Sequence, residues 1–243
     1  MIKFIVFCTK ILVAAVVAVL FASCNQVFEG VKGNGNVQKE QRKISEPFTK
    51  ISVNRGLEVI VEQGDAVKVE VEADENLLKH ITTKVENGTL IVSSDENIYS
   101  SEKEVVRVTM PVIEGLETTS GSNLSSTSVL KGSKMYVKSS SGSEIDVNAE
   151  FDTISSESTS GSNITLSGKA LKFTSASSSG SEIEAGNLLA NEVVAQSTSG
   201  SSTNVNPRVS LNAKASSGSS IEYSNQPKTI VKEETSGGSV SGL

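Results

Sequence analysis

The stretch Ser-Thr-Ser-Gly-Ser-Asn-Ile at residues 158–164 is the clearest copy of a unit that recurs through the second half of the chain. The glycines of the copies are Gly121, Gly142, Gly161, Gly180, Gly200, Gly218 and, in a degenerate seventh copy, Gly237. Their spacings are 21, 19, 19, 20, 18 and 19 residues. A period near 20 residues is too short for a pair of helices and matches one coil of a β-solenoid. The repeat therefore predicts about seven stacked coils of 18–21 residues.

Two apolar columns keep register with these glycines, which a flexible Gly/Ser linker has no reason to do. Three residues after each glycine come Leu124, Ile145, Ile164, Ile183, Thr203, Ile221 and Val240. Seven residues before each glycine, from the second copy on, come Met135, Ile154, Phe173, Val193, Leu211 and Ile230. Residues two positions beyond the first column face the same side of a strand, namely Val147, Leu166, Ala185, Val205 and Tyr223. We expect these columns to be inward core ladders with coils about 4.8 Å apart.

The glycine and its neighbours predict the coil corner. Only glycine readily adopts a positive φ or allows very close approach, so we place it at a corner of each coil. A serine precedes the glycine in all seven copies, and the residue before that serine is always Ser or Thr. These small hydroxyl side chains are expected to hydrogen-bond from coil to coil. Glu144, Asn163 and Glu182 follow successive glycines by two residues, which keeps like charges about 9.6 Å apart instead of about 4.8 Å.

The N-terminus has the features of a secretory signal. Lys3 and Lys10 precede an uninterrupted apolar run of 12 residues, 11–22. A membrane-spanning helix needs about 20 apolar residues, so this run predicts a segment that is removed.

The residues around the predicted cleavage site resemble a bacterial lipobox, because small residues precede Cys24, although Phe21 stands where that pattern usually has Leu. We therefore predict a lipoprotein signal peptide over residues 1–23 and lipidation of Cys24. The other cysteine, Cys8, would be removed with the signal, so the mature chain would have a single thiol and no internal disulfide.

Composition changes divide the remaining chain into three parts. Residues 24–45 are polar with several glycines and predict a flexible tether. Residues 46–112 alternate apolar and polar side chains, for instance over 57–62 and 67–72, and predict a strand-rich lead-in or cap. Residues 113–243 contain the solenoid repeats.

The charge balance excludes one class of partner. The chain has 22 basic and 28 acidic residues and a formal net charge of −6; loss of the two signal lysines leaves 20 basic residues and a net charge of −8. Nucleic-acid binding requires a basic patch that neutralises phosphates, and the sequence offers none.

The sequence contains no convincing catalytic or metal-binding pattern. Serine hydrolysis needs a base beside the nucleophile, and the one histidine, His80, lies outside the repeats in a predicted turn. The best acidic candidates are two pairs, Glu144 with Asp146 and Glu182 with Glu184, in which both members face the same side of a strand. We interpret these pairs as a solvated acidic face in preference to a ligand site. We predict no catalytic residue, no metal site and no cofactor.

The lipoprotein-like signal, the lead-in Phe48-Thr49-Lys50-Ile51-Ser52-Val53 and the repeated Gly-Ser-Asn/Glu-Ile units together resemble the auto-transporter adhesin family with the head GIN domain, which is common in Bacteroidetes. The similarity covers roughly Phe48 to Tyr223. It implies an all-β fold, a right-handed parallel β-helix preceded by an irregular strand-rich unit, and an adhesin-like role.

These observations lead to one functional hypothesis and one alternative. We expect a non-enzymatic cell-envelope lipoprotein that binds a glycan, an envelope protein or a host protein through a repetitive Ser/Thr-rich surface, since repetition multiplies weak contacts. The alternative is a β-helix polysaccharide lyase or hydrolase. The lipid on Cys24 predicts outer-membrane anchoring, facing either the periplasm or the cell surface. Residues 25–28 contain no acid, unlike surface-exported lipoproteins that the N-terminus resembles, which favours the periplasm.

Overall fold

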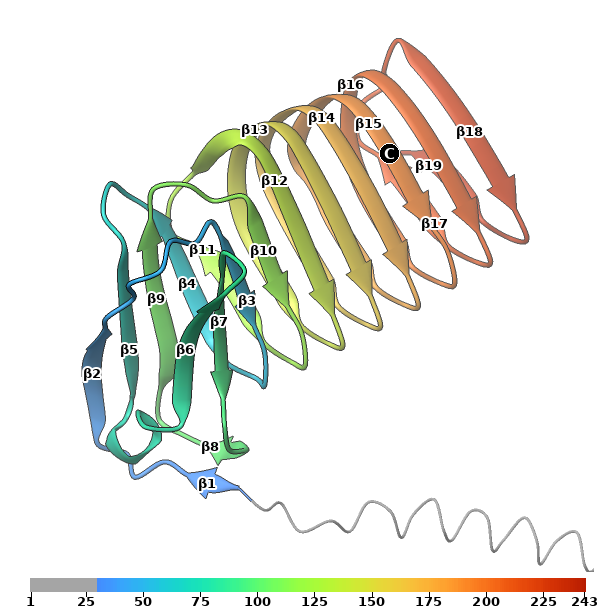
Figure 1. Cartoon of the computed structure of the whole chain (residues 1–243). Coiled ribbons are helices and arrows are strands. Elements are labelled where there is room, and N and C mark those ends of the chain that lie inside the picture. The colour runs from blue at the N-terminus through green and yellow to red at the C-terminus, as the bar shows by residue number, and fades with distance from the viewer. Residues whose placement is uncertain (1–29) are drawn as a thin grey trace, which may run out of the picture.

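The computed structural model describes residues 30–243, so the predicted signal peptide and Cys24 lie outside the described part. This part is built from strands, and its one helical element is the 3-10 turn η1 (Glu75–Leu77). A row of similar coils forms an elongated body, and an irregular group of strands covers its N-terminal end (Figure 1). The prediction of a β-solenoid with a strand-rich N-terminal unit is confirmed.

Each coil has one strand segment before the Ser-Gly turn and one after it. The strands of the coils are β10 (Gly115–Thr118), β11 (Asn123–Ser126), β12 (Leu130–Ser140), β13 (Glu144–Thr159), β14 (Asn163–Ser178), β15 (Glu182–Ser197), β16 (Ser202–Ser216), β17 (Ser220–Tyr223), β18 (Thr229–Thr235) and β19 (Ser239–Gly242). Strands β13 to β16 are 15 or 16 residues long and pass through the bend opposite the turn. Each therefore belongs first to one sheet and then to the other.

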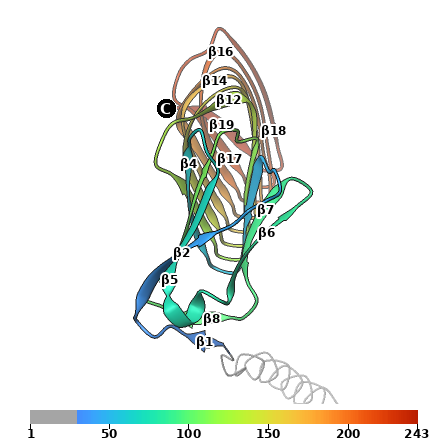
Figure 2. The same cartoon turned by 60° about the vertical axis from the view of Figure 1, so that its left-hand side comes forward.

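All neighbouring coils pair in parallel, and the repeat positions keep the register that the sequence predicts, with irregularities between β14 and β15 and between β15 and β16. Ile145 pairs with Ile164 and Ile164 with Ile183, while Ile154 pairs with Phe173 on the other sheet. The coils lie one behind another along the stack when the molecule is turned (Figure 2). The repeat period thus fixes which residues become neighbours across coils.

Most strands of the N-terminal unit continue the two sheets of the solenoid, and its first and eighth strands form a separate two-stranded sheet. Its strands are β1 (Val31–Lys32), β2 (Val37–Arg42), β3 (Lys50–Val53), β4 (Glu58–Gln63), β5 (Lys68–Asp74), β6 (Ile81–Glu86), β7 (Thr89–Ser94), β8 (Ile98–Ser100) and β9 (Glu104–Met110). Strands β3 and β4 pair in parallel with β10 and β11, and the turn between them, Arg55-Gly56, has the same two positive φ angles as the Ser-Gly turns. The first coil of the stack therefore lies inside the lead-in. Antiparallel strands β6, β5 and β2 complete the sheets at this end.

The sequence predicts a flexible tether over residues 24–45, but residues 37–42 form strand β2, paired antiparallel with β5. The charged side chains that suggest a tether have partners here: Lys39 Nζ lies 3.1 Å from Glu70 Oε1, and this contact lowers the pKa of the Glu70 carboxyl. The glycines allow close packing, because a Cβ on Gly33 would lie 1.9 Å from Asp74 Oδ2. An edge strand with one solvated face needs few apolar residues, so its polarity does not exclude it.

The half of the coil interior that lies toward the bend is largely aliphatic. The columns three after and seven before the repeat glycine are buried, with at most 5% of any side chain exposed, except that Ile230 in the last coil is partly buried. Residues Val147, Leu166, Ala185, Val205 and Tyr223 are buried as well. Full burial of one such large aliphatic side chain contributes about 1.5–3 kcal/mol. These ladders supply most of the apolar core of the solenoid.

The half of the interior beside the turn is lined with hydroxyl groups. A buried serine follows the glycine in every copy except the last, where Gly238 takes its place, and the residue three before the glycine is buried in most coils. Ser162 Oγ lies 2.8 Å from the carbonyl oxygens of both Ser139 and Thr159, and it accepts a 3.1 Å hydrogen bond from the Thr159 amide. Equivalent contacts recur at Ser201. This serine joins the two ends of its own turn to the preceding coil.

The turn itself consists of two residues with left-handed backbone conformations. Each repeat glycine has φ between 68° and 79°, and the serine before it has φ between 49° and 57°. A Cβ on Gly161 would meet no atom within 4 Å, so space is not what requires glycine here. Glycine is favoured because it adopts the positive φ of the turn without strain. The Gly161 amide donates to the Ser179 carbonyl of the next coil at 3.2 Å. The turns therefore form a hydrogen-bonded column along one edge.

Candidate functional site

The strands that follow the turns expose an acidic face. Its outward columns lie two and four residues after each repeat glycine and contain five acids and no Lys or Arg within residues 123–241. The acids are Glu144, Asp146, Glu182, Glu184 and Glu222. Asn163 lies between Glu144 and Glu182, and Thr165 between Asp146 and Glu184. The predicted alternation of charged and neutral residues is confirmed by this register.

The acidic pairs do not assemble into a catalytic site. Glu144, Asp146, Glu182 and Glu184 are all exposed, and none of them lines either of the two hollows described below. His80 lies in the N-terminal unit, where its Nδ1 atom is 2.9 Å from Asp95 Oδ1. No group of three or more potential metal ligands occurs among residues 30–243. The structure thus brings together no acid, base and nucleophile from the sequence candidates.

The strands that precede the turns expose a face of mixed charge, which we call the mixed face. The column four residues before the repeat glycine contains Glu117, Lys138, Glu157, Ala176, Gln196, Lys214 and Glu233. Lys138 pairs with Glu157 at 3.2 Å, and Lys214 with Glu233 at 2.7 Å. Ala176 and Gln196 interrupt this ladder of ion pairs at its centre.

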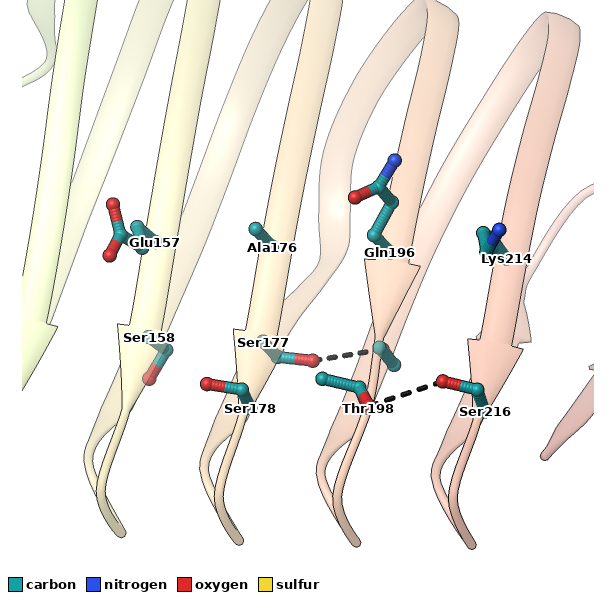
Figure 3. Close-up of a pocket in the computed structure, with 10 residues that line it drawn as sticks. Glu157, Ser158, Ala176, Ser177, Ser178, Gln196, Thr198, Lys214 and Ser216 are labelled. Atoms are coloured by element: carbon teal, nitrogen blue, oxygen red, sulfur yellow. Dashed lines mark hydrogen bonds between the residues drawn. The ribbon is translucent and has the colours of Figure 1, made fainter. Parts of the chain in front are cut away.

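The interruption leaves a hollow of about 240 Å³ on the mixed face (Figure 3). Glu157, Ala176, Gln196 and Lys214 form one row, and Ser178, Thr198 and Ser216 form a second row closer to the turns. The remaining lining residues are Ser158, Ser177 and Ser197. The hollow exists because alanine occupies a position that neighbouring coils fill with long side chains.

The polar groups around this hollow are largely ordered by neighbours. The Tyr136 hydroxyl donates to Glu157 Oε2 at 3.0 Å, and burial, with the Glu157 contact, raises the pKa of Tyr136. Thr198 and Ser216 are hydrogen-bonded at 3.1 Å. Gln196, by contrast, is exposed, and its side-chain amide makes no hydrogen bond with the described residues. Its amide remains available as both donor and acceptor.

A second hollow of about 370 Å³ lies at the bend opposite the turns. It has an apolar floor that includes Phe151 and Ala170, and the exposed side chains of Leu171 and Leu189 lie at its rim. A register irregularity between β15 and β16 adjoins it. Basic and acidic side chains both line it, so its charge does not favour one ligand sign.

The predicted hydroxyl contacts between coils are present in pairs. Thr119 contacts Ser140 at 3.0 Å, and Thr159 contacts Ser178 at 3.1 Å, in addition to the Thr198–Ser216 pair.

The repeat glycines lie at the turns and the core-ladder residues lie inside, whereas the lipidation prediction at Cys24 falls outside the described residues. No helix within residues 30–243 has the length and apolarity to span a membrane.

Sequence reasoning missed the hollow, although its signal was present. The column four residues before the glycine alternates in charge at both ends and becomes uncharged at Ala176 and Gln196. That column carries no apolar or glycine marker, so the features that reveal the repeat do not draw attention to it. Its outward direction follows from the buried columns three and seven residues before the glycine.

A stack of parallel coils with polar outer faces places the chain in the class of parallel β-solenoid proteins. The family described as "Putative auto-transporter adhesin, head GIN domain" matches residues 47–227, and the chain belongs to this family. Membership indicates a protein of the cell envelope or cell surface. No curated protein matches the chain.

Solved structures share the fold. A protein described as a putative adhesin from Bacteroides fragilis is 20% identical, with a TM-score of 0.82 over 88% of this chain and 100% of that one. A similarly described protein from Parabacteroides merdae is 20% identical, with a TM-score of 0.71 over 88% and 98%. A protein from Parabacteroides distasonis, described as lipid binding, is 19% identical, with a TM-score of 0.70 over 88% and 99%.

Proposed function

We propose that the protein is a non-enzymatic, lipid-anchored binding module of the cell envelope. Its solenoid presents a repetitive polar surface to a glycan or to an envelope or host protein, and the lipid on Cys24 holds it at the outer membrane. The observation that carries the proposal is the pair of continuous outer faces, on which Ser, Thr, Asn and acidic side chains recur in register from coil to coil.

Repetition is the physical basis of the proposal. Equivalent outward residues recur at about 4.8 Å per coil, so a repetitive ligand can make several weak contacts at once. A rigid scaffold also lowers the entropic cost of multiple contacts, since the hydroxyl groups are already ordered by coil-to-coil hydrogen bonds. Membership in a family described as adhesins supports the same role.

The first test is the location of the solenoid. An epitope inserted in the repeat region is exposed to protease on intact and on permeabilised cells. Digestion on intact cells is expected for a surface adhesin; protection until permeabilisation would confine binding to periplasmic partners. Recovery of the wild-type protein in the soluble fraction of washed cells would contradict the envelope proposal.

The lipid anchor is tested separately by the variant Cys24→Ser. We expect this variant to leave the membrane fraction, because acylation contributes about 0.8 kcal/mol for each buried CH₂ group. The matched control is Cys8→Ser, which changes the other cysteine of the chain and is expected to remain with the membrane. Membrane retention of Cys24→Ser would show that another segment holds the protein there.

A further inference from the structure

We propose that the hollow around Ala176 and Gln196 binds a single uncharged sugar unit of a glycan. This inference rests on the proposed binding function and names its ligand class and its contact site. The charges, the size and the hydrogen-bonding groups of the hollow support this ligand class.

The charges at the rim are already compensated. Glu157 contacts Lys138 at 3.2 Å and accepts a hydrogen bond from Tyr136 at 3.0 Å, while Lys214 contacts Glu233 at 2.7 Å. A cationic ligand would have to compete with Lys138 for Glu157 and would be repelled by Lys214. An anionic ligand would have to compete with Glu233 for Lys214 and would be repelled by Glu157. Between the pairs, the two residues of the same column carry no charge. The site therefore favours a ligand without net charge.

The hollow offers both hydrogen-bond donors and hydrogen-bond acceptors. The Gln196 amide can donate and accept, and it has no partner among the described residues. The hydroxyls of Ser178 and Thr198 each have one coil-to-coil contact and retain further hydrogen-bonding capacity. Sugar hydroxyls are themselves both donors and acceptors, so they match this arrangement better than a purely apolar or purely anionic group.

The size and position of the hollow fit one unit of a longer chain. Its volume of about 240 Å³ is below the roughly 300–1,000 Å³ of pockets that enclose drug-sized ligands. The hollow opens on a flat face rather than into the interior, and its two rows of residues run along the stack (Figure 3). A glycan could therefore continue along neighbouring coils on either side of the bound unit.

The second hollow, at the bend, has a lining of different character. Its floor is apolar and its rim carries Lys169, Arg208 and Asp152 among others, so nothing in it selects an uncharged polar ligand. Ion pairs flank Ala176 and Gln196 on both sides, whereas at the second hollow Glu150, which contacts Lys131 at 3.1 Å, itself lines the hollow.

The test uses saturation-transfer NMR to measure the binding of defined sugars to the purified full chain. The neutral probes are methyl β-galactoside, methyl β-glucoside and the methyl glycoside of N-acetylglucosamine; the charged probes are glucuronate and glucosamine. The variant Ala176→Gln fills the hollow from an exposed position without disturbing the core. The matched control Thr165→Gln places a glutamine at an outward position on the acidic face of the same strand, β14.

We expect at least one neutral sugar to give a signal that exceeds those of both charged sugars. Ala176→Gln should weaken its binding by about tenfold, comparable to the loss of one or two hydrogen bonds, and Thr165→Gln should leave it unchanged. The proposal is overturned if no neutral sugar binds, if a charged sugar binds better, or if Ala176→Gln binds like the wild type. The protease and Cys24→Ser tests do not involve this hollow, so its failure would leave the envelope-lipoprotein proposal standing.

Discussion

The two halves of the coil interior stabilise the solenoid in different ways. Toward the bend, the ladders of Ile145, Ile164 and Ile183 exclude water along the whole stack. Beside the turn, buried serines replace aliphatic residues, and their hydroxyls bond to backbone groups of their own turn and of the preceding coil. One half supplies apolar area, and the other supplies directional contacts.

The difference explains how a repetitive sequence maintains a single register. Apolar burial is non-directional, so on its own it would tolerate a shift of two residues, which keeps the same side chains facing inward. A buried hydroxyl must find its hydrogen-bond partner, so a shifted coil would leave unsatisfied polar groups. Thr203 illustrates the coupling: it replaces the usual isoleucine, and its hydroxyl lies 2.8 Å from both Ser177 and Ser197.

The largest effect is expected from placing a charge in the aliphatic half. Ile164→Asp would bury a carboxylate where 0% of the isoleucine is exposed and where both neighbours in the ladder are isoleucines. We expect a loss of at least about 4 kcal/mol and no cooperative unfolding transition under conditions where the wild type has one. Chemical denaturation followed by circular dichroism measures this.

The matched control is Thr174→Asp. This residue faces outward on the same strand, between Ser155 and Val194, and the added charge remains solvated. Its unfolding midpoint should stay close to that of the wild type. An unchanged midpoint for Ile164→Asp would show that the ladder is not the core.

The sequence was sufficient to predict the ladders because apolar residues and glycines are distinctive markers at a fixed spacing. The buried serines were not recognised, since serine is usually exposed and its inward direction is visible only from alternation. The serine after the glycine lies two residues before a buried isoleucine, so it must face the same side. Strand β2 was missed for a different reason: its stability comes from pairing with β5 and from Lys39–Glu70, which no local pattern reveals.

An intermediate effect is expected in the hydroxyl half. Ser162→Ala removes the acceptor for the Thr159 amide and the donor that reaches the Ser139 carbonyl. Leaving such buried groups unsatisfied costs about 1–3 kcal/mol. Hydrogen exchange should accelerate at the Thr159 amide, whereas the Ser178 amide, which bonds to Ser181 in the next coil, should change less. Equal acceleration at both amides would mean that the serine stabilises the stack as a whole rather than its own turn.

The smallest effect, with the opposite sign, is expected for Ser156 and Ser175. These two serines pair across neighbouring coils, are buried, and have no hydrogen-bond partner for their hydroxyls among the described residues. Replacing both by alanine removes buried polar groups without breaking a bond, so stability should rise by up to about 1 kcal/mol. The outward variant Ser155→Ala on the same strand controls for the difference in strand propensity between serine and alanine, and it should leave stability nearly unchanged. If the double variant instead loses as much stability as Ser162→Ala, then Ser156 and Ser175 take part in a hydrogen-bonded network, and directional contacts extend further from the turn than the division into two halves implies.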